Sequence, residues 1–136
     1  RLQGDATHLV VTRTDPGAIF IYRWADVGAN MQPVLTLDAA GVRSRFSMNL
    51  PEHAIIRDGQ LFIADTINNR VLYWSSLESA ASRAPDAILG AADLNDVSPE
   101  IGRNKLFWPA GMAFDGQNLW VGEYKFSNRM VRFSKR

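Results

Sequence analysis

Cysteine is absent from this chain of 136 residues, which excludes disulfide bonds, thiolate metal ligands and cysteine nucleophiles. Histidine is scarce, because His8 and His53 are the only two. The chain also lacks the G-x-S-x-G, H-E-x-x-H and phosphate-loop motifs of common enzyme classes. Neither sign of charge is in excess, since 15 Lys and Arg residues stand against 14 Asp and Glu. This balance excludes a bulk polyanion-binding protein but leaves a local basic patch open.

Long apolar runs are missing as well. No run approaches the roughly 20 residues that a membrane helix needs, so we expect no membrane segment. The first residues carry no signal-peptide pattern. Because the chain starts with Arg1 and not with methionine, we expect it to have been cut from a longer polypeptide or processed. The composition leaves the cellular compartment open.

The composition is that of a globular protein, with 46% hydrophobic and 21% charged residues. Within residues 1–136 the clearest pattern is an internal repeat, in which residues 51–75 align with residues 109–134. Both copies begin with proline, share the turn sequence Asp-Gly-Gln and continue into an apolar triplet and an Asn-Arg pair. A weaker third copy lies upstream, with its apolar triplet at residues 9–11. The spacing between copies is close to that of propeller repeats.

Each copy reads as short β-strands. In the middle copy they are residues 53–57, 61–64, 70–74 and 87–89, rich in branched and aromatic side chains and separated by turn signals such as Asp58-Gly59. In the first copy we expect strands at 9–11, 19–22 and 34–37. Residues 75–83 could form one or two helical turns, and residues 95–105 read as a long loop. The sequence therefore predicts an all-β fold of four-stranded antiparallel units.

The repeat resembles the NHL repeat, the blade unit of a family of β-propellers. The residues that carry the resemblance in the last copy are Pro109, Gly111, Ala113, Asp115, Gly116, Leu119, Val121, Asn128 and Arg129, and in the middle copy Asp65, Asn68, Asn69, Arg70 and Val71. It covers residues 51–134 well and residues 7–50 poorly, because the first copy lacks the Asn-Arg pair. The resemblance implies a β-propeller of four-stranded antiparallel blades.

We predict one partial propeller over residues 1–136, with units at about 1–50, 51–108 and 109–136. A propeller closes a ring of four to eight blades, and this chain supplies about three. The first unit is expected to begin near its second strand and the last to stop after its third. Exposed apolar faces would remain, so we expect a homo-oligomer that completes a ring of about six blades, or the remainder of a longer chain.

A polar motif recurs in the second and third units. Asp65, Asn69 and Arg70 in one copy correspond to Glu123, Asn128 and Arg129 in the next. The acidic residue ends one strand and the arginine opens the following one, so a charge-assisted hydrogen bond between them is expected. Because the arrangement repeats, it is typical of scaffold residues. Trp74, Trp108 and Trp120 are likewise expected in the apolar core.

The loops that gather at one end of such units form the candidate binding face. Glu52 and His53 are expected at its inner rim, with His53 towards a central channel. Trp108, Tyr124, Lys125 and Phe126 are the expected aromatic and basic binding residues, with Arg103 and Lys105 adding charge nearby. The alternative interpretation is packing of the long loop over its own unit.

The predicted function is a non-catalytic binding or scaffolding module, with no cofactor, that binds a protein or small-molecule ligand on this face. One alternative is a metal-dependent propeller lyase or hydrolase with a channel site, as in the amidating lyases and the strictosidine-synthase-like group. Glu52, His53 and Asp65 would then be the first residues to test, although this chain lacks the several channel histidines of the amidating lyases. A second alternative is single-stranded RNA binding by the aromatic and basic residues, which the net charge of +1 disfavours.

Overall fold

A computed structural model describes residues 1–38 and 47–134, so the end of the first predicted unit and the last two residues lie outside the described part. The described residues form three antiparallel sheets, two of four strands and one of three. Sheet 1 contains β1 (Leu2–Gly4), β2 (His8–Arg13), β3 (Ala18–Arg23) and β4 (Leu35–Asp38). Sheet 2 contains β5 (Pro51–Arg57), β6 (Gln60–Asp65), β7 (Arg70–Trp74) and β8 (Ala87–Leu89). Sheet 3 contains β9 (Pro109–Phe114), β10 (Asn118–Glu123) and β11 (Met130–Ser134).

The all-β prediction is confirmed, with one correction. The first unit does not begin near its second strand, because β1 precedes β2 and pairs with it through three residues. The two helical segments among the described residues are short: η1 (Trp24–Asp26) and α2 (Leu77–Ala80). The segment between β8 and β9 contains no strand, as expected, and only an isolated bridge joins Gly102 to Lys105.

The internal repeat is visible in the strand register. Leu61 pairs with Trp74 in sheet 2, and the aligned residues Leu119 and Phe133 pair in sheet 3. Sheet 1 has the same pairing between Leu9 and Tyr22. The three sheets therefore share one up-and-down pairing pattern.

The hairpin turns follow from local sequence. Asp58 and Gly59 both have positive φ, 52° and 73°, as a two-residue hairpin turn requires. In sheet 3, the carboxylate of Asp115 accepts hydrogen bonds from the amides of Gln117 and Asn118 at 2.8 and 2.6 Å, which closes the equivalent turn.

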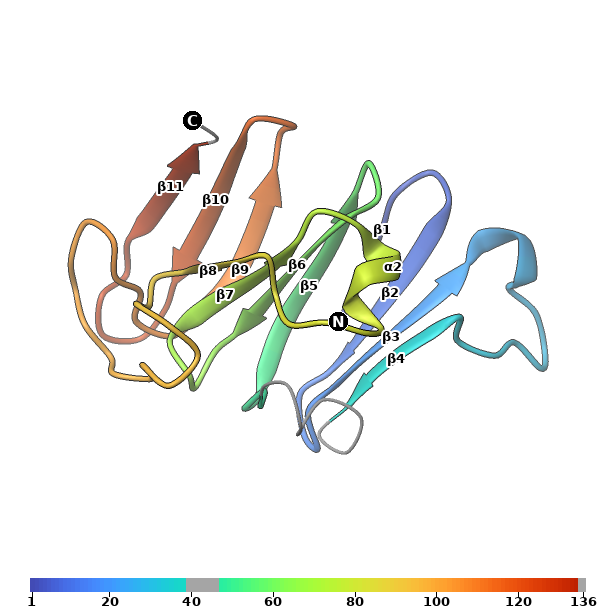
Figure 1. The fold of residues 1–136 in the computed structure, drawn as a ribbon, viewed down its shortest axis with the longest axis horizontal. Coiled ribbons are helices and arrows are strands. Elements are labelled where there is room, and N and C mark those ends of the chain that lie inside the picture. The colour runs from blue at the N-terminus through green and yellow to red at the C-terminus, as the bar shows by residue number, and fades with distance from the viewer. Residues whose placement is uncertain (39–46, 135–136) are drawn as a thin grey trace.

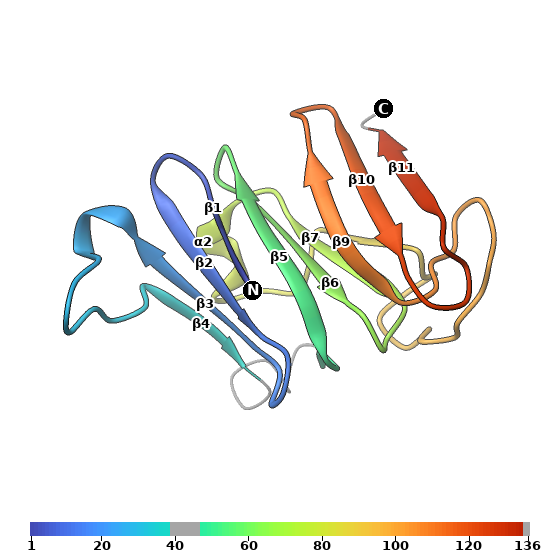
Figure 2. The same ribbon diagram turned by 180° about the vertical axis from the view of Figure 1, so that it is seen from behind.

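The sheets stack face to face in a row, with sheet 2 in the middle (Figure 1). Their first strands lie side by side, since β5 contacts both β1 and β9, and the reverse view shows these strands in front (Figure 2). One apolar cluster fills the space between sheets 1 and 2, and a second fills the space between sheets 2 and 3. Sheet 2 is therefore buried on both faces, which explains its nearly continuous apolar strands.

Candidate binding face

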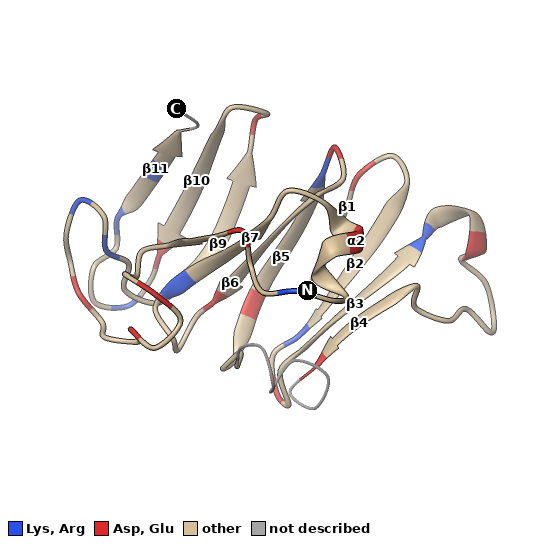
Figure 3. Cartoon of the chain, in the orientation of Figure 1, with Lys and Arg blue, Asp and Glu red and all other residues tan. Residues whose placement is uncertain are grey.

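The loops that follow β6 and β10 lie at the same end of the strands as the long segment 90–108 (Figure 1). We call this the loop-rich end. Charges of both signs lie along its segments (Figure 3). Lys105, expected to add positive charge here, is engaged by Asp96 at 2.8 Å and Glu100 at 3.7 Å. The hydrogen bond from Lys105 lowers the pKa of Asp96 to about 2. The positive charge of Lys105 is therefore compensated by two neighbouring carboxylates.

A fully buried ion pair anchors the first loop of this end. Arg70 Nε donates to Asp65 Oδ2 at 2.8 Å, and neither side chain is exposed to solvent. The other nitrogens of Arg70 donate to the carbonyl oxygens of Leu94 and Ser47 at 2.6 and 2.7 Å. Asp65 also accepts from the amide of Asn49 at 2.7 Å. A buried pair survives only when its remaining polar atoms are satisfied, as they are here.

Glu123 and Arg129 repeat the arrangement in sheet 3. Two nitrogens of Arg129 donate to the two carboxylate oxygens of Glu123 at 2.6 and 2.9 Å. Arg129 also donates to the carbonyl oxygens of Gly102 and Lys105 at 2.8 and 2.6 Å. Burial acts to raise the pKa of Glu123, but the hydrogen bonds that it accepts outweigh burial and lower that pKa. Both ion pairs expected from the sequence are present, and both fasten the long segment to a sheet.

The two asparagines of the motif adopt left-handed backbone conformations. Asn69 has φ of 57° and Asn128 of 47°. The side chain of Asn69 links three segments, because its amide nitrogen donates to the carbonyl oxygen of Val97 at 2.9 Å and its oxygen accepts from the amide of Trp108 at 3.1 Å. The motif residues thus shape the loops, as side chains that tolerate this conformation can.

Four aromatic rings meet above this scaffold. The ring of Phe107 stacks on Phe126 at a centroid distance of 5.6 Å, and Trp108 lies 5.7 Å from Phe126 and 6.2 Å from Tyr124. The Lys125 ammonium lies 4.7 Å from the centre of the Trp108 ring, at cation–π distance. We call these five residues the aromatic cluster. Phe126 is 69% exposed, so the cluster presents apolar surface to solvent.

The structure brings together four of the six predicted binding residues, those at positions 108 and 124–126. It adds Phe107, which sequence reasoning missed although the Phe-Trp pair directly before Pro109 was visible. Lys125 has φ of 69° and Trp108 of 49°, conformations that are uncommon for residues other than glycine. The surrounding hydrogen bonds hold the loops in these conformations.

His53 and Glu52 lie elsewhere, on β5. His53 is buried beside β9, where the Met112 amide donates to Nδ1 at 2.9 Å. That it faces a central channel stays a prediction, because the described sheets do not close a ring. Burial, followed by the positive charge of Arg1, lowers the pKa of His53 to about 4. The imidazole therefore serves as a neutral hydrogen-bond acceptor between two sheets. Glu52 is half-buried beside it in sequence.

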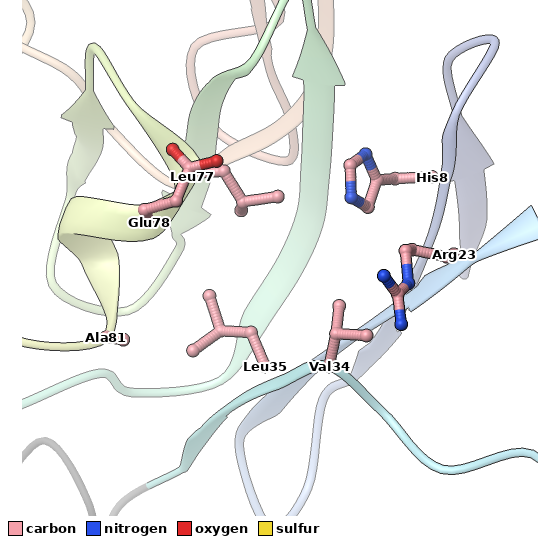
Figure 4. A pocket seen from close by; sticks show the side chains of 7 residues that line it. All are labelled: His8, Arg23, Val34, Leu35, Leu77, Glu78 and Ala81. Atoms are coloured by element: carbon pink, nitrogen blue, oxygen red, sulfur yellow. The ribbon is translucent and has the colours of Figure 1, made fainter.

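A pocket of about 480 Å³ between sheet 1 and α2 has no counterpart in the sequence analysis. Figure 4 shows His8 and Arg23 on one side and Glu78 on the other. Each of these groups already has a partner: Arg23 pairs with Asp26, His8 contacts the Thr7 hydroxyl, and Glu78 accepts from Ser76. Because its residues come from sheet 1 and from the segment around α2, which are far apart in the sequence, no local sequence signal marks this pocket.

Within residues 1–38 and 47–134, no group of three His, Asp or Glu side chains is arranged to hold a metal ion. None of the helices described is long and apolar enough to span a bilayer. In comparisons with known proteins, no family model matches the chain and no curated protein matches it significantly. The resemblance to NHL repeats therefore stays a prediction from the residues themselves.

Proposed function

We propose that the chain is part of an NHL-type β-propeller and acts as a non-catalytic binding module through the aromatic cluster. Three copies of one up-and-down sheet, stacked with their first strands side by side, support the propeller architecture. The observation that carries the binding function is the exposed aromatic cluster, held on loops that two arginine–carboxylate pairs fix to the sheets.

Exposed aromatic rings on rigid loops are suited to binding. Aromatic residues are enriched at interfaces because they bury a large area at a small entropic cost. The backbone conformation of this face is fixed before any ligand arrives, since Asn69, Arg70 and Arg129 bond the main chain of the long segment. Preorganisation of this kind reduces the free-energy cost of association.

The metal-dependent enzyme alternative has less support. Two of its three candidate residues are already engaged: Nδ1 of His53 accepts from Met112, and Asp65 is bonded to Arg70 inside the protein. The RNA-binding alternative shares the aromatic cluster, but the cation nearest the rings, Lys125, is directed onto Trp108. We therefore propose an apolar or aromatic peptide segment as the ligand.

The test is selection of twelve-residue peptides from a random display library on the purified protein, followed by titration of synthetic copies. Phe126→Ala is expected to weaken binding at least about tenfold, the effect of losing roughly 1.4 kcal/mol of contact energy at an interface residue. Ile101→Ala is the matched control, because Ile101 is 63% exposed on the long segment that supplies Phe107 and Trp108 but lies outside the aromatic cluster.

A labelled single-stranded oligouridine of the same length is titrated in parallel at low and high salt. Binding that weakens steeply with salt would favour the RNA alternative. Equal affinities of Phe126→Ala and the wild type for the selected peptides would refute the aromatic cluster as the binding site.

A further inference from the structure

The two outer faces of the row of sheets are not covered by the described residues (Figures 1 and 2). The register places these side chains on the open face of sheet 1: Leu2, Leu9, Val11, Phe20 and Tyr22. It places these on the open face of sheet 3: Ala113, Trp120, Gly122, Met130 and Arg132. Leu2 is 66% and Met130 69% exposed. Figure 3 shows that charged residues are sparse on the strands themselves.

The repeat relates both open faces to faces that pack inside the protein. Sheet 2 turns one side towards sheet 3, here called the front, with Phe62, Ala64, Val71 and Tyr73. The open face of sheet 3 carries the residues aligned with these four: Trp120, Gly122, Met130 and Arg132. The open face of sheet 3 is therefore its front.

Sheet 2 turns its other side, the back, towards sheet 1, with Leu61, Ile63, Leu72 and Trp74. The open face of sheet 1 carries the aligned residues Leu9, Val11, Phe20 and Tyr22, so it is a back. Inside the protein, a front always meets a back, at both interfaces. The chain therefore exposes one front and one back, which are the two halves of an interface that it already makes twice.

The side chains at the open faces differ in size from those at the packed interfaces. Between sheets 2 and 3, the ring of Phe62 packs on Phe114 at a centroid distance of 4.8 Å. On the open front, the larger Trp120 takes the place of Phe62. On the open back, Gly4 takes the place of Phe114, because each pairs with the aligned leucine of the next strand. A Cβ on Gly4 would lie 2.5 Å from the His8 carbonyl oxygen and 3.4 Å from the Trp24 ring, so Trp120 of the front would pack beside Gly4 and Trp24 of the back.

Charge disfavours contact between two copies of the same front face. Arg132 stacks on Trp120 with its guanidinium carbon 5.7 Å from the ring centre. Two such fronts in contact would bury like charges against each other, which is costly. In a front-to-back contact, Arg132 takes the place that Tyr73 has between sheets 2 and 3. There Tyr73 of sheet 2 lines a pocket together with Phe133 of sheet 3. The residue aligned with Phe133 on the open back is Tyr22, whose aromatic ring can receive a guanidinium.

We propose that the front of sheet 3 in one copy docks on the back of sheet 1 in a second copy, head to tail. Two copies then form two identical interfaces and leave no sheet face open, a closed ring with two-fold symmetry. The inference deepens the propeller architecture proposed above and does not depend on the aromatic cluster.

The test is the mass of the wild-type chain by light scattering after gel filtration, between about 1 and 100 μM, a range within which many specific homodimers dissociate. The expected mass is twice that of the chain. Trp120→Asp on the front and Leu9→Asp on the back are each expected to weaken dimerisation about 100-fold, because each buries an unpaired carboxylate in both interfaces. Ser82→Asp, an exposed position outside both faces, is the control and should stay dimeric.

Mixing the two variants distinguishes head-to-tail docking from the alternatives. A mixed dimer keeps one intact interface, between the front of the Leu9→Asp chain and the back of the Trp120→Asp chain, so dimers should reappear. A wild type that is monomeric throughout, dissociation by only one variant, or a mixture that stays monomeric would each overturn the proposal. Met130→Arg and Leu2→Arg, at more exposed positions, replace the pair if circular dichroism shows loss of β-structure.

The peptide titration is repeated on the monomeric Trp120→Asp chain. Unchanged peptide affinity would show that the binding face functions without the ring. Loss of dimerisation with retained binding therefore separates a failure of this inference from a failure of the proposed function.

Discussion

Protonation of His53 is expected to destabilise the fold in mildly acidic solution. The ring accepts the Met112 amide on Nδ1, so a proton on that nitrogen would replace an acceptor with a donor and break the bond. In the folded protein, burial and the charge of Arg1 lower the pKa of His53 from 6.5 to about 4. Between these two values the unfolded chain takes up a proton that the folded protein does not.

The sign and size of the effect follow from this difference. Because the unfolded state binds more protons, this contribution to the free energy of unfolding has its full value above pH 6.5 and falls as the pH drops towards 4. Each pKa unit is worth 1.36 kcal/mol, so the loss is about 2 kcal/mol by pH 5 and about 3 kcal/mol by pH 4. The carboxylates of Asp96 and Asp115, whose pKa values are lowered to about 2, contribute acid sensitivity only below this range.

Urea unfolding followed by circular dichroism at pH 7, 6, 5 and 4 measures the effect. His53→Asn places an uncharged acceptor near the position of Nδ1 and is expected to remove most of the dependence between pH 6.5 and 4. His8→Asn, at the other histidine, should retain it. A wild type of constant stability over this range, or a His53→Asn variant with the same slope as the wild type, would refute the reasoning.

Two further predictions concern stability and use the same urea assay. Arg70→Met leaves the Asp65 carboxylate buried without its cation and is expected to lower the free energy of unfolding by about 3–5 kcal/mol. Arg23→Met removes an exposed pair and should lower it by about 1 kcal/mol or less. Equal losses would show that the buried pair has no special role. Gly90 has φ of 88°, and a Cβ there would lie 2.5 Å from a leucine side chain. Gly90→Ala should therefore lower the free energy of unfolding by roughly 2–4 kcal/mol. A Cβ on Gly28 would have nothing within 4 Å, so Gly28→Ala should change stability by less than about 0.5 kcal/mol.

Much of the fold could be predicted because each strand is short, apolar and bounded by a turn signal. The pair of Asp58 and Gly59 fixed one hairpin, and the repeat transferred its register to the next sheet. β1 was missed because its three residues, all exposed, carry no alternating pattern. Its strand conformation depends on pairing with β2, which local sequence does not encode.

The candidate site was only partly predictable for a similar reason. Tyr124 and Phe126 are close in sequence, in the loop after β10. Trp108 lies directly before β9, and the pairing of β9 with β10 brings it to them. The hydrogen bond from the Met112 amide to His53 could not be predicted, because packing between sheets decides which residues of two first strands meet. Trp120, expected in the core, is 37% exposed because it faces outwards from the last sheet.

Both guanidinium groups at the loop-rich end hold the long segment by its carbonyl oxygens and not by its side chains. A carbonyl oxygen is present whatever residue supplies it, so the clamp tolerates changes of identity along positions 94–105. The segment can accordingly accept substitutions while its path over the sheets is preserved. The guanidinium clamps thus separate the backbone path of this segment from the identity of its side chains.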